Sequence, residues 1–350
     1  MTEIHQLLIP LRIVLAEALQ EQEGLRVDSV HIEKVINRPF SDVAFLRAIT
    51  SGGERKLVLK KTVHHPANIS ITKRQNQAVV EYEILSKLYP LFQSVPHCHV
   101  PRPILVMPEH EAYIMDFVEG LLLLDYFSAA KYFASRNSFD ELSEYYYLCG
   151  VWLKKLHEFT GVRNAGIEAF SNTIERCEHK LKLIEEANDP RFPKNLTSIV
   201  RHLLDEHLNL VRNEDILVTG RHGDFGSWNI IASPNGVTVI DFLGYQEDLL
   251  PIDLFKMLMN FEDEKKYLFF SKNRIEAVKR EFLRGYGDVP QISRPVATIC
   301  EALHRVCSLS AGITSTPYKL WHRIERRLSV KANLDWFMNH DNLLLWEISR

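Results

Sequence analysis

The chain has 350 residues, more than one compact core usually requires, so its length favours two domains or two lobes. Hydrophobic residues make up 46% and charged residues 25%, which excludes a disordered or fibrous chain. The 42 Lys and Arg residues against 45 Asp and Glu give a formal net charge of −3, so no global charge directs the protein to nucleic acid or to an anionic membrane. Any partner must therefore be selected by a local site.

The cysteines and the N-terminus indicate a compartment. Five cysteines without a CxxC pair argue against a disulfide framework or a zinc ribbon and favour a reducing environment. The N-terminal MTEIHQ carries an acid where an export signal needs positive charge, and no apolar run reaches the roughly 18 residues that span a bilayer. We therefore expect a cytoplasmic protein with neither membrane nor nucleic-acid partners, and the pattern does not indicate an oligomeric state.

The first third of the sequence predicts strands around one helix. Apolar residues recur with a helical period over 72–89, and Pro90 is expected to end that helix. Runs rich in Val, Ile, Leu and Phe predict one antiparallel sheet, with strands at 29–37, 42–50, 56–62, 104–107 and 112–118. We place a lobe boundary after residue 118.

The rest of the chain predicts helices with one interruption. Helical patterns occupy 139–159, 172–187 and 196–211, and they return after Pro251. Between them, the turn sequence SPNG at residues 233–236 indicates a lone β-hairpin. The expected fold class is therefore α+β, with a β-rich lobe and a mainly helical lobe that carries the hairpin.

The hairpin brings oxygen-bearing side chains together. If the SPNG turn closes it, Asn229 at the start of the first strand faces residue 240 or 241 at the end of the second. Asp224 lies five residues before Asn229, in a loop that can reach the same edge. Such oxygens suit Mg²⁺, which keeps several waters and usually completes its shell with substrate phosphates.

Phosphoryl transfer needs little more from a protein. Its transition state is stabilised by positioning and charge neutralisation, with one carboxylate that orients the acceptor hydroxyl and takes its proton. Asp224 is the candidate for this base. We expect His222, two residues earlier, to brace the loop.

These residues carry a family resemblance. HxDxxxxN at residues 222–229 followed by IDF at 240–242 resembles the aminoglycoside phosphotransferase and choline kinase superfamily, which has a bilobal protein-kinase-like fold. LKKLH, YIMDFVEG, PIDL and FLRGYG support the resemblance, which covers residues 25–290. It implies that Asp224 is the catalytic base and that Asn229 and Asp241 hold Mg²⁺.

The resemblance also implies a nucleotide site in the first lobe. Lys60 matches the strand lysine that contacts the nucleotide phosphates, with Lys61 as the alternative register. Glu81 matches the helix glutamate that pairs with that lysine, with Glu83 as the alternative.

Three further residues receive roles from the same resemblance. The backbone around Asp116 and Val118 would meet the adenine, and Asp253 in PIDL would tie down the catalytic loop. The turn at 38–42 contains no glycine, unlike the phosphate loop of protein kinases, although Ser41 could still donate a hydrogen bond to a phosphate.

The acceptor is expected to be small. Only eleven residues separate Asp241 from Asp253, which is too short for an activation loop that docks a peptide, and no APE motif follows. This argues against a protein kinase.

We therefore expect lobes at 1–118 and 119–350, and an Mg²⁺-dependent phosphotransferase that moves the γ-phosphoryl group of ATP or GTP to an alcohol group. The acceptor would be a metabolite, an amino sugar or an aminoglycoside-like antibiotic. The alternative, suggested by the glycine-free turn, is a nucleotide-binding protein that has lost turnover.

Overall fold

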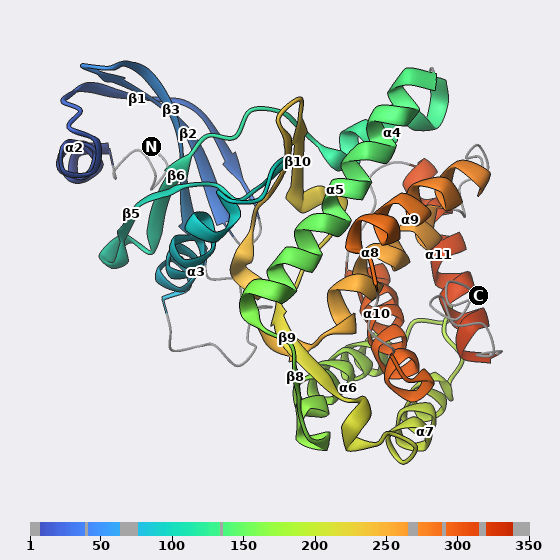
Figure 1. The fold of residues 1–350 in the computed structure, drawn as a ribbon. Coiled ribbons are helices and arrows are strands. Elements are labelled where there is room, and N and C mark those ends of the chain that lie inside the picture. The colour runs from blue at the N-terminus through green and yellow to red at the C-terminus, as the bar shows by residue number, and fades with distance from the viewer. Residues whose placement is uncertain are drawn as a thin grey trace. The chain divides into compact units, whose positions relative to one another are not determined.

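The computed structural model describes residues 8–38, 41–63, 76–133, 136–264, 272–288, 292–314 and 320–338. The fold is α+β, as the sequence predicts, and the chain forms two compact units (Figure 1). Unit 1 comprises Met1–Leu122 and Asn229–Tyr245, and unit 2 comprises Leu123–Trp228 and Gln246–Arg350. The predicted lobe boundary after residue 118 stays a prediction.

A five-stranded antiparallel sheet is the centre of unit 1, in the order β1-β2-β3-β6-β5. Its strands are β1 (Val27–Asn37), β2 (Ser41–Thr50), β3 (Gly53–Thr62), β5 (Pro103–Met107) and β6 (Ala112–Asp116). All five predicted strands are therefore confirmed, with ends shifted by a few residues. The pairing of β3 with β6 places Lys60 opposite Tyr113, which fixes the surroundings of the lysine discussed below.

Helix α3 (Gln77–Phe92) begins with a side-chain cap, because the Asn76 carboxamide accepts hydrogen bonds from the N–H groups of Ala78 and Val79. The expectation that Pro90 ends this helix is wrong, since the helix continues to Phe92. Pro90 removes the hydrogen bond that an N–H at this position would donate to the Ser86 carbonyl, but its fixed φ of about −65° is helical, so the turn can continue to Phe92. The predicted start at 72–75 lies outside the described residues.

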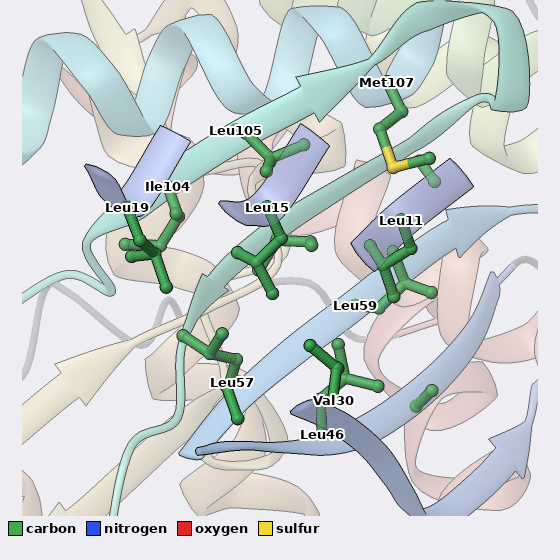
Figure 2. Packing of buried hydrophobic residues seen from close by; sticks show 14 residues of the cluster. Leu11, Leu15, Leu19, Val30, Leu46, Leu57, Leu59, Ile104, Leu105 and Met107 are labelled. Carbon is green, nitrogen blue, oxygen red and sulfur yellow. The ribbon is translucent and has the colours of Figure 1, made fainter. Parts of the chain in front are cut away.

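An unpredicted helix, α2 (Leu8–Glu23), covers the sheet of unit 1. Leu11, Leu15 and Leu19 recur every fourth residue, so they share one helix face, and they are buried in a cluster with strand residues (Figure 2). Pro10 sits in the first turn, where a proline is tolerated. Apolar side chains also occur on the exposed face, as at Ile13, so the helical period is hard to recognise in the sequence.

The predicted hairpin is present in unit 1 as β10 (Ile230–Ser233) and β11 (Gly236–Val239), with Ile230 opposite Val239. The Ile240 N–H donates to the Asn229 carbonyl at 2.9 Å, so Asn229 faces residue 240 as expected. The hairpin is not alone, however. It joins β4 (Cys98–His99) and β7 (Leu121–Leu122) in a sheet of order β4-β11-β10-β7. Strands of two residues have no readable periodicity, so the sequence could not indicate them.

Unit 2 is mainly helical, as predicted. Its helices are α4 (Leu123–Phe133), α5 (Arg136–Thr160), α6 (Ser171–Ala187), α7 (Leu196–Leu208), α8 (Pro251–Glu264), α9 (Lys272–Tyr286), α10 (Arg294–Thr314) and α11 (Leu320–Met338). A small unpredicted sheet runs in the order β12-β9-β8, with β8 at Arg163–Asn164, β9 at Leu217–Arg221 and β12 at Gln246–Leu249. Across the described part of the chain, no helix is long and apolar enough to cross a membrane.

Helices α5 and α9 approach at backbone distance. A Cβ atom at Gly150 would lie 2.0 Å from the Phe282 carbonyl oxygen, and one at Gly285 would lie 1.9 Å from the Tyr147 carbonyl oxygen. Beside this contact, His157 is buried with its Nδ1 2.8 Å from the Tyr286 hydroxyl. The LKKLH and FLRGYG motifs thus contribute to one helix interface in unit 2.

Two buried histidines predict a specific acid sensitivity. Burial, together with the nearby charge of Lys154, lowers the pKa of His157 to about 3, and burial lowers the pKa of His304 well below its ordinary value. Between pH 6.5 and 5 the unfolded chain therefore binds protons that the folded chain does not. As the pH is lowered through this window, the free energy of unfolding should decrease, by up to about 1.4 kcal/mol per pH unit for each histidine. Above pH 6.5 it should level off.

Urea unfolding at pH 5.0, 5.75, 6.5 and 7.25 measures this slope. The variant His157→Gln should remove about half of it, whereas His202→Gln, at an exposed position on α7, should leave it unchanged. A slope that is the same in wild type and in His157→Gln would contradict the assignment of a buried neutral imidazole.

Candidate active site

A buried ionic cluster in unit 1 contains several of the predicted site residues. Lys60 Nζ lies 2.8 Å from both carboxylate oxygens of Glu81 and 2.8 Å from Asp241 Oδ1. The Lys60 side chain is only 10% exposed and that of Glu81 only 2%, so the pair is almost fully removed from water. Glu83, the alternative partner, is exposed on the outer face of α3. The ion pair therefore uses Lys60 and Glu81, in the first of the two registers considered.

The charges in this cluster support one another. Burial alone would lower the pKa of Lys60, but the adjacent carboxylates of Glu81 and Asp241 outweigh it and raise that pKa above its ordinary value. Tyr113, opposite Lys60 on β6, is buried and hydrogen-bonded to Glu81, and its pKa is raised well above the usual range, first by burial and then by these carboxylates. The cluster thus favours the charged form of the Lys60 ammonium and the neutral form of the Tyr113 phenol.

Asp241 is fixed by an unusual backbone conformation. Its φ and ψ are 69° and 70°, in the left-handed region that few residues other than glycine adopt. The next N–H, that of Phe242, donates to Glu81 Oε1 at 2.9 Å. Glu81 therefore holds both Lys60 and the backbone that follows Asp241.

Asn229 and Asp241 belong to the same end of the hairpin. Asn229 is buried, while the Asp241 side chain remains 34% exposed. Their amide and carboxylate oxygens are hard ligands of the kind that Mg²⁺ prefers, so this donor set fits the predicted ion. Within the described ranges, no group of three or more His, Cys, Asp or Glu side chains could hold a metal alone. An ion here would need further oxygens from water or substrate.

The predicted hinge follows β6. The Asp116 carboxylate accepts hydrogen bonds from Arg55, at 2.7 Å from Nη2 and 3.2 Å from Nε, so its side chain is already engaged. The Phe117 N–H donates to the Lys56 carbonyl. Val118 comes next, outside the ladder, and any adenine contact in this segment would involve the backbone. Ser41 begins β2 and is buried, while residues 39–40 of the glycine-free turn lie outside the described residues.

The loop of unit 2 that contains Asp224 is tied to helix α8. The Asp253 carboxylate accepts hydrogen bonds from the N–H groups of His222, at 2.5 Å, and Gly223, at 3.1 Å, which confirms its expected structural role. His222 is fully buried, and its Nδ1 accepts a hydrogen bond from the Asp224 N–H at 3.3 Å. It braces the loop, as expected. Gly223 has a φ of 91°, which a residue with a Cβ would adopt only under strain.

Both oxygens of the Asp224 carboxylate have partners within unit 2. The Trp228 indole N–H donates to Oδ2 at 2.9 Å, and Lys256 Nζ lies 3.1 Å from Oδ1. The side chain is nevertheless 47% exposed, so an incoming molecule could reach it. The expected convergence of Asp224 with Asn229 and Asp241 stays a prediction.

Three of these contacts were not predicted from the sequence. Tyr113 begins the strand sequence Tyr-Ile-Met-Asp, and nothing in that sequence indicated a role in the site. Lys256 stands three residues after Asp253 in PIDLFK, and Trp228 stands four residues after Asp224. A helix that begins at Pro251 places residues 253 and 256 one turn apart on the same side, so the lysine could have been found from that spacing.

A family model matches most of the chain. The sequence profile of the phosphotransferase enzyme family, APH, matches residues 35–296, about three quarters of the chain. The protein therefore belongs to this phosphotransferase family. A comparison with curated proteins gives no significant match.

Solved structures of small-molecule kinases share the fold. The amicoumacin kinase hAmiN, in complex with AMP-PNP, Ca²⁺ and Ami, has a TM-score of 0.55 and 12% identity, covering 98% of this chain and 97% of its own. A glucosamine kinase has a TM-score of 0.54 and 12% identity, covering 91% and 97%. The choline kinase LicA from Streptococcus pneumoniae has a TM-score of 0.52 and 14% identity, covering 93% and 99%. At these identities the likeness establishes the kinase-like fold.

Proposed function

We propose that this protein transfers the γ-phosphoryl group of ATP or GTP to a hydroxyl of a small molecule, in a reaction that depends on Mg²⁺. The observation that carries the proposal is the buried cluster in which Lys60 is held by Glu81 and Asp241. A cluster used only for stability gains little from burying the Lys60–Glu81 ion pair, because desolvation offsets most of the attraction between the two charges. The same arrangement would serve phosphoryl transfer, in which the ammonium contacts the nucleotide phosphates and the Asp241 carboxylate holds the metal ion that binds them.

Each unit supplies part of the chemistry. In unit 1, Lys60 would contact the nucleotide phosphates, and Asn229 and Asp241 would hold the ion, which neutralises phosphate charge when bound. The backbone of Asp116 and Val118 would meet the base, and Ser41 would donate to a phosphate. In unit 2, Asp224 would accept the proton of the acceptor hydroxyl. That oxygen then bonds to the γ-phosphorus as the bond to the β,γ-bridging oxygen breaks, releasing the nucleoside diphosphate.

The family and the short segment between Asp241 and Asp253 together support a small acceptor. The solved structures that share the fold include an amicoumacin kinase, a glucosamine kinase and a choline kinase. The eleven residues between Asp241 and Asp253 leave no room for a peptide-docking loop. We therefore place the acceptor among small metabolites, amino sugars and antibiotics. The five cysteines are free, which supports a reducing, cytoplasmic location.

A second candidate is a nucleotide-binding protein without turnover, favoured by the absence of glycine from residues 38–42. Titration calorimetry with MgATP and MgGTP, combined with ADP or GDP formation over a panel of hydroxyl compounds, separates the two. We expect nucleotide binding that requires Mg²⁺, with turnover stimulated by at least one acceptor. Binding without turnover across the panel would favour the second candidate, and no nucleotide binding would contradict both.

A further inference from the structure

Lys256 gives the base of unit 2 a cationic neighbour that the family motif does not contain. Its Nζ lies 3.1 Å from Asp224 Oδ1 and 5.2 Å from the centre of the Trp228 ring. The Trp228 indole N–H meanwhile donates to the other oxygen, Oδ2. The three side chains therefore contact one another in a closed triangle, with the ammonium bound both by a carboxylate and by an aromatic face.

The triangle is held in place from several sides. Lys256 is on α8, one turn after Asp253, whose carboxylate holds the backbone of the catalytic loop. Trp228 is pressed against the chain at Gly226, where a Cβ atom would lie 2.6 Å from the indole ring. Phe225, which directly follows Asp224, stacks on Trp152 with ring centres 5.5 Å apart. Lys256 is thus delivered to Asp224 by the element that also positions the loop.

The Lys256 ammonium affects which charge an acceptor molecule can carry next to Asp224. An unshielded carboxylate would attract a cationic acceptor, but here the charge of Asp224 is balanced by Lys256 at hydrogen-bond distance. The Lys256 side chain is still 27% exposed, so it faces the same surroundings as the carboxylate. A cationic group next to the reacting hydroxyl would meet a like charge, whereas a carboxylate or a phosphate there would gain an attractive partner.

We propose that Lys256 is a specificity-determining residue and that it selects acceptors with a neutral or anionic group, and not an ammonium, beside the phosphorylated hydroxyl. This rests on the proposed kinase function and narrows its acceptor class. The rest of the acceptor can still carry an amine at a distance from the reacting carbon.

Charge-matched acceptors test the proposal. Glycerate, glycerol and 3-aminopropane-1,2-diol share a three-carbon hydroxyl framework and differ in one terminal group. Glucuronate, glucose and 6-amino-6-deoxyglucose form a second series that differs only at C6 of a hexose. With saturating MgATP, the kcat/KM for ADP formation should be at least tenfold higher for the carboxylate or neutral member than for the ammonium member of each series.

Variants at position 256 should change this ranking. Lys256→Arg should keep the order, Lys256→Met should bring the members within about threefold, and Lys256→Glu should raise the ammonium member above the carboxylate. Lys182→Glu, at a lysine 71% exposed on α6, is the charge-matched control and should keep the wild-type order. If Lys256 only stabilised the fold, its replacement would lower kcat/KM by the same factor for all three acceptors of a series. A change in the ratio between these values therefore reports on charge beside the acceptor.

Three results would overturn the proposal. The first is a wild type that prefers the ammonium member, and the second is Lys256→Glu with an unchanged ratio, both of which leave the kinase assignment intact. The third is a wild type that binds MgATP without turning over any acceptor, which would contradict the proposed function itself.

Discussion

Replacing Asp224 by Asn should reduce Mg²⁺-dependent nucleoside diphosphate formation by about 10²- to 10⁴-fold, the usual contribution of a general base. The carboxamide keeps the shape of the side chain and can still accept the Trp228 N–H, but it cannot take a proton from the acceptor. In steady-state assays the loss should appear in kcat. The affinity for MgATP, measured by calorimetry, should change by no more than about twofold, because Asp224 is assigned to the acceptor.

Asp205→Asn is the matched control, since Asp205 is an exposed aspartate on α7 of the same unit. It should retain wild-type kcat and MgATP affinity. The assignment of the base is contradicted if Asp224→Asn keeps more than about a tenth of the wild-type kcat while Asp205→Asn behaves as expected.

Replacing Lys60 by Met should affect both activity and stability. The change removes the proposed phosphate contact, so turnover should fall by about 10²- to 10³-fold. It also leaves Glu81, which is 2% exposed, beside Asp241 without the cation that both carboxylates share. Removing one partner of a buried pair costs about 3–5 kcal/mol, which urea unfolding would measure as a lower midpoint with an unchanged slope.

A second change separates these two effects. In Lys60→Met/Glu81→Leu the uncompensated charge is gone, so a large part of the lost stability should return, reduced by the Phe242 N–H that loses its acceptor. Turnover should not return, because neither side chain can meet a phosphate. A double variant that is as active as the wild type would contradict the functional role of the cluster. Lys61→Met, at the alternative register, is the control and should be near wild type in both measurements.

The predictability of the fold depended on the length of each element. Strand β2 consists mostly of apolar or β-branched side chains, and β3 contains the apolar run 57–59, so both were recognised from sequence. Strand β9 reads only LVTGR and pairs with the four-residue β12 and the two-residue β8, so its partners could not be inferred. Helix α2 was missed because its apolar residues are not confined to one face: Leu11, Leu15 and Leu19 are buried, but Ile13 is 59% exposed. Here tertiary burial outweighed the local pattern.

The candidate site shows the same division. The pairing of Lys60 with Glu81 could be anticipated because the family resemblance named both positions. The hydrogen bond from the Phe242 N–H to Glu81 could not, because it joins residues 161 positions apart, and no sequence pattern marked the left-handed backbone at Asp241. Lys256 lay outside every motif considered, and only the start of α8 at Pro251 shows which side of the helix it occupies. Sequence thus gave the chemical groups, and the structure gave their partners.

In the proposed reaction, the γ-phosphoryl group moves from a nucleotide to a small hydroxyl compound. The most direct measurement uses γ-³²P-labelled ATP with Mg²⁺ and a metabolite extract that contains no protein, followed by separation of small phosphate esters, inorganic phosphate and labelled protein. We predict that wild-type protein places the label in an ester that phosphatase can cleave, and that Asp224→Asn does not. Label found only in inorganic phosphate, or only on protein, would contradict the account.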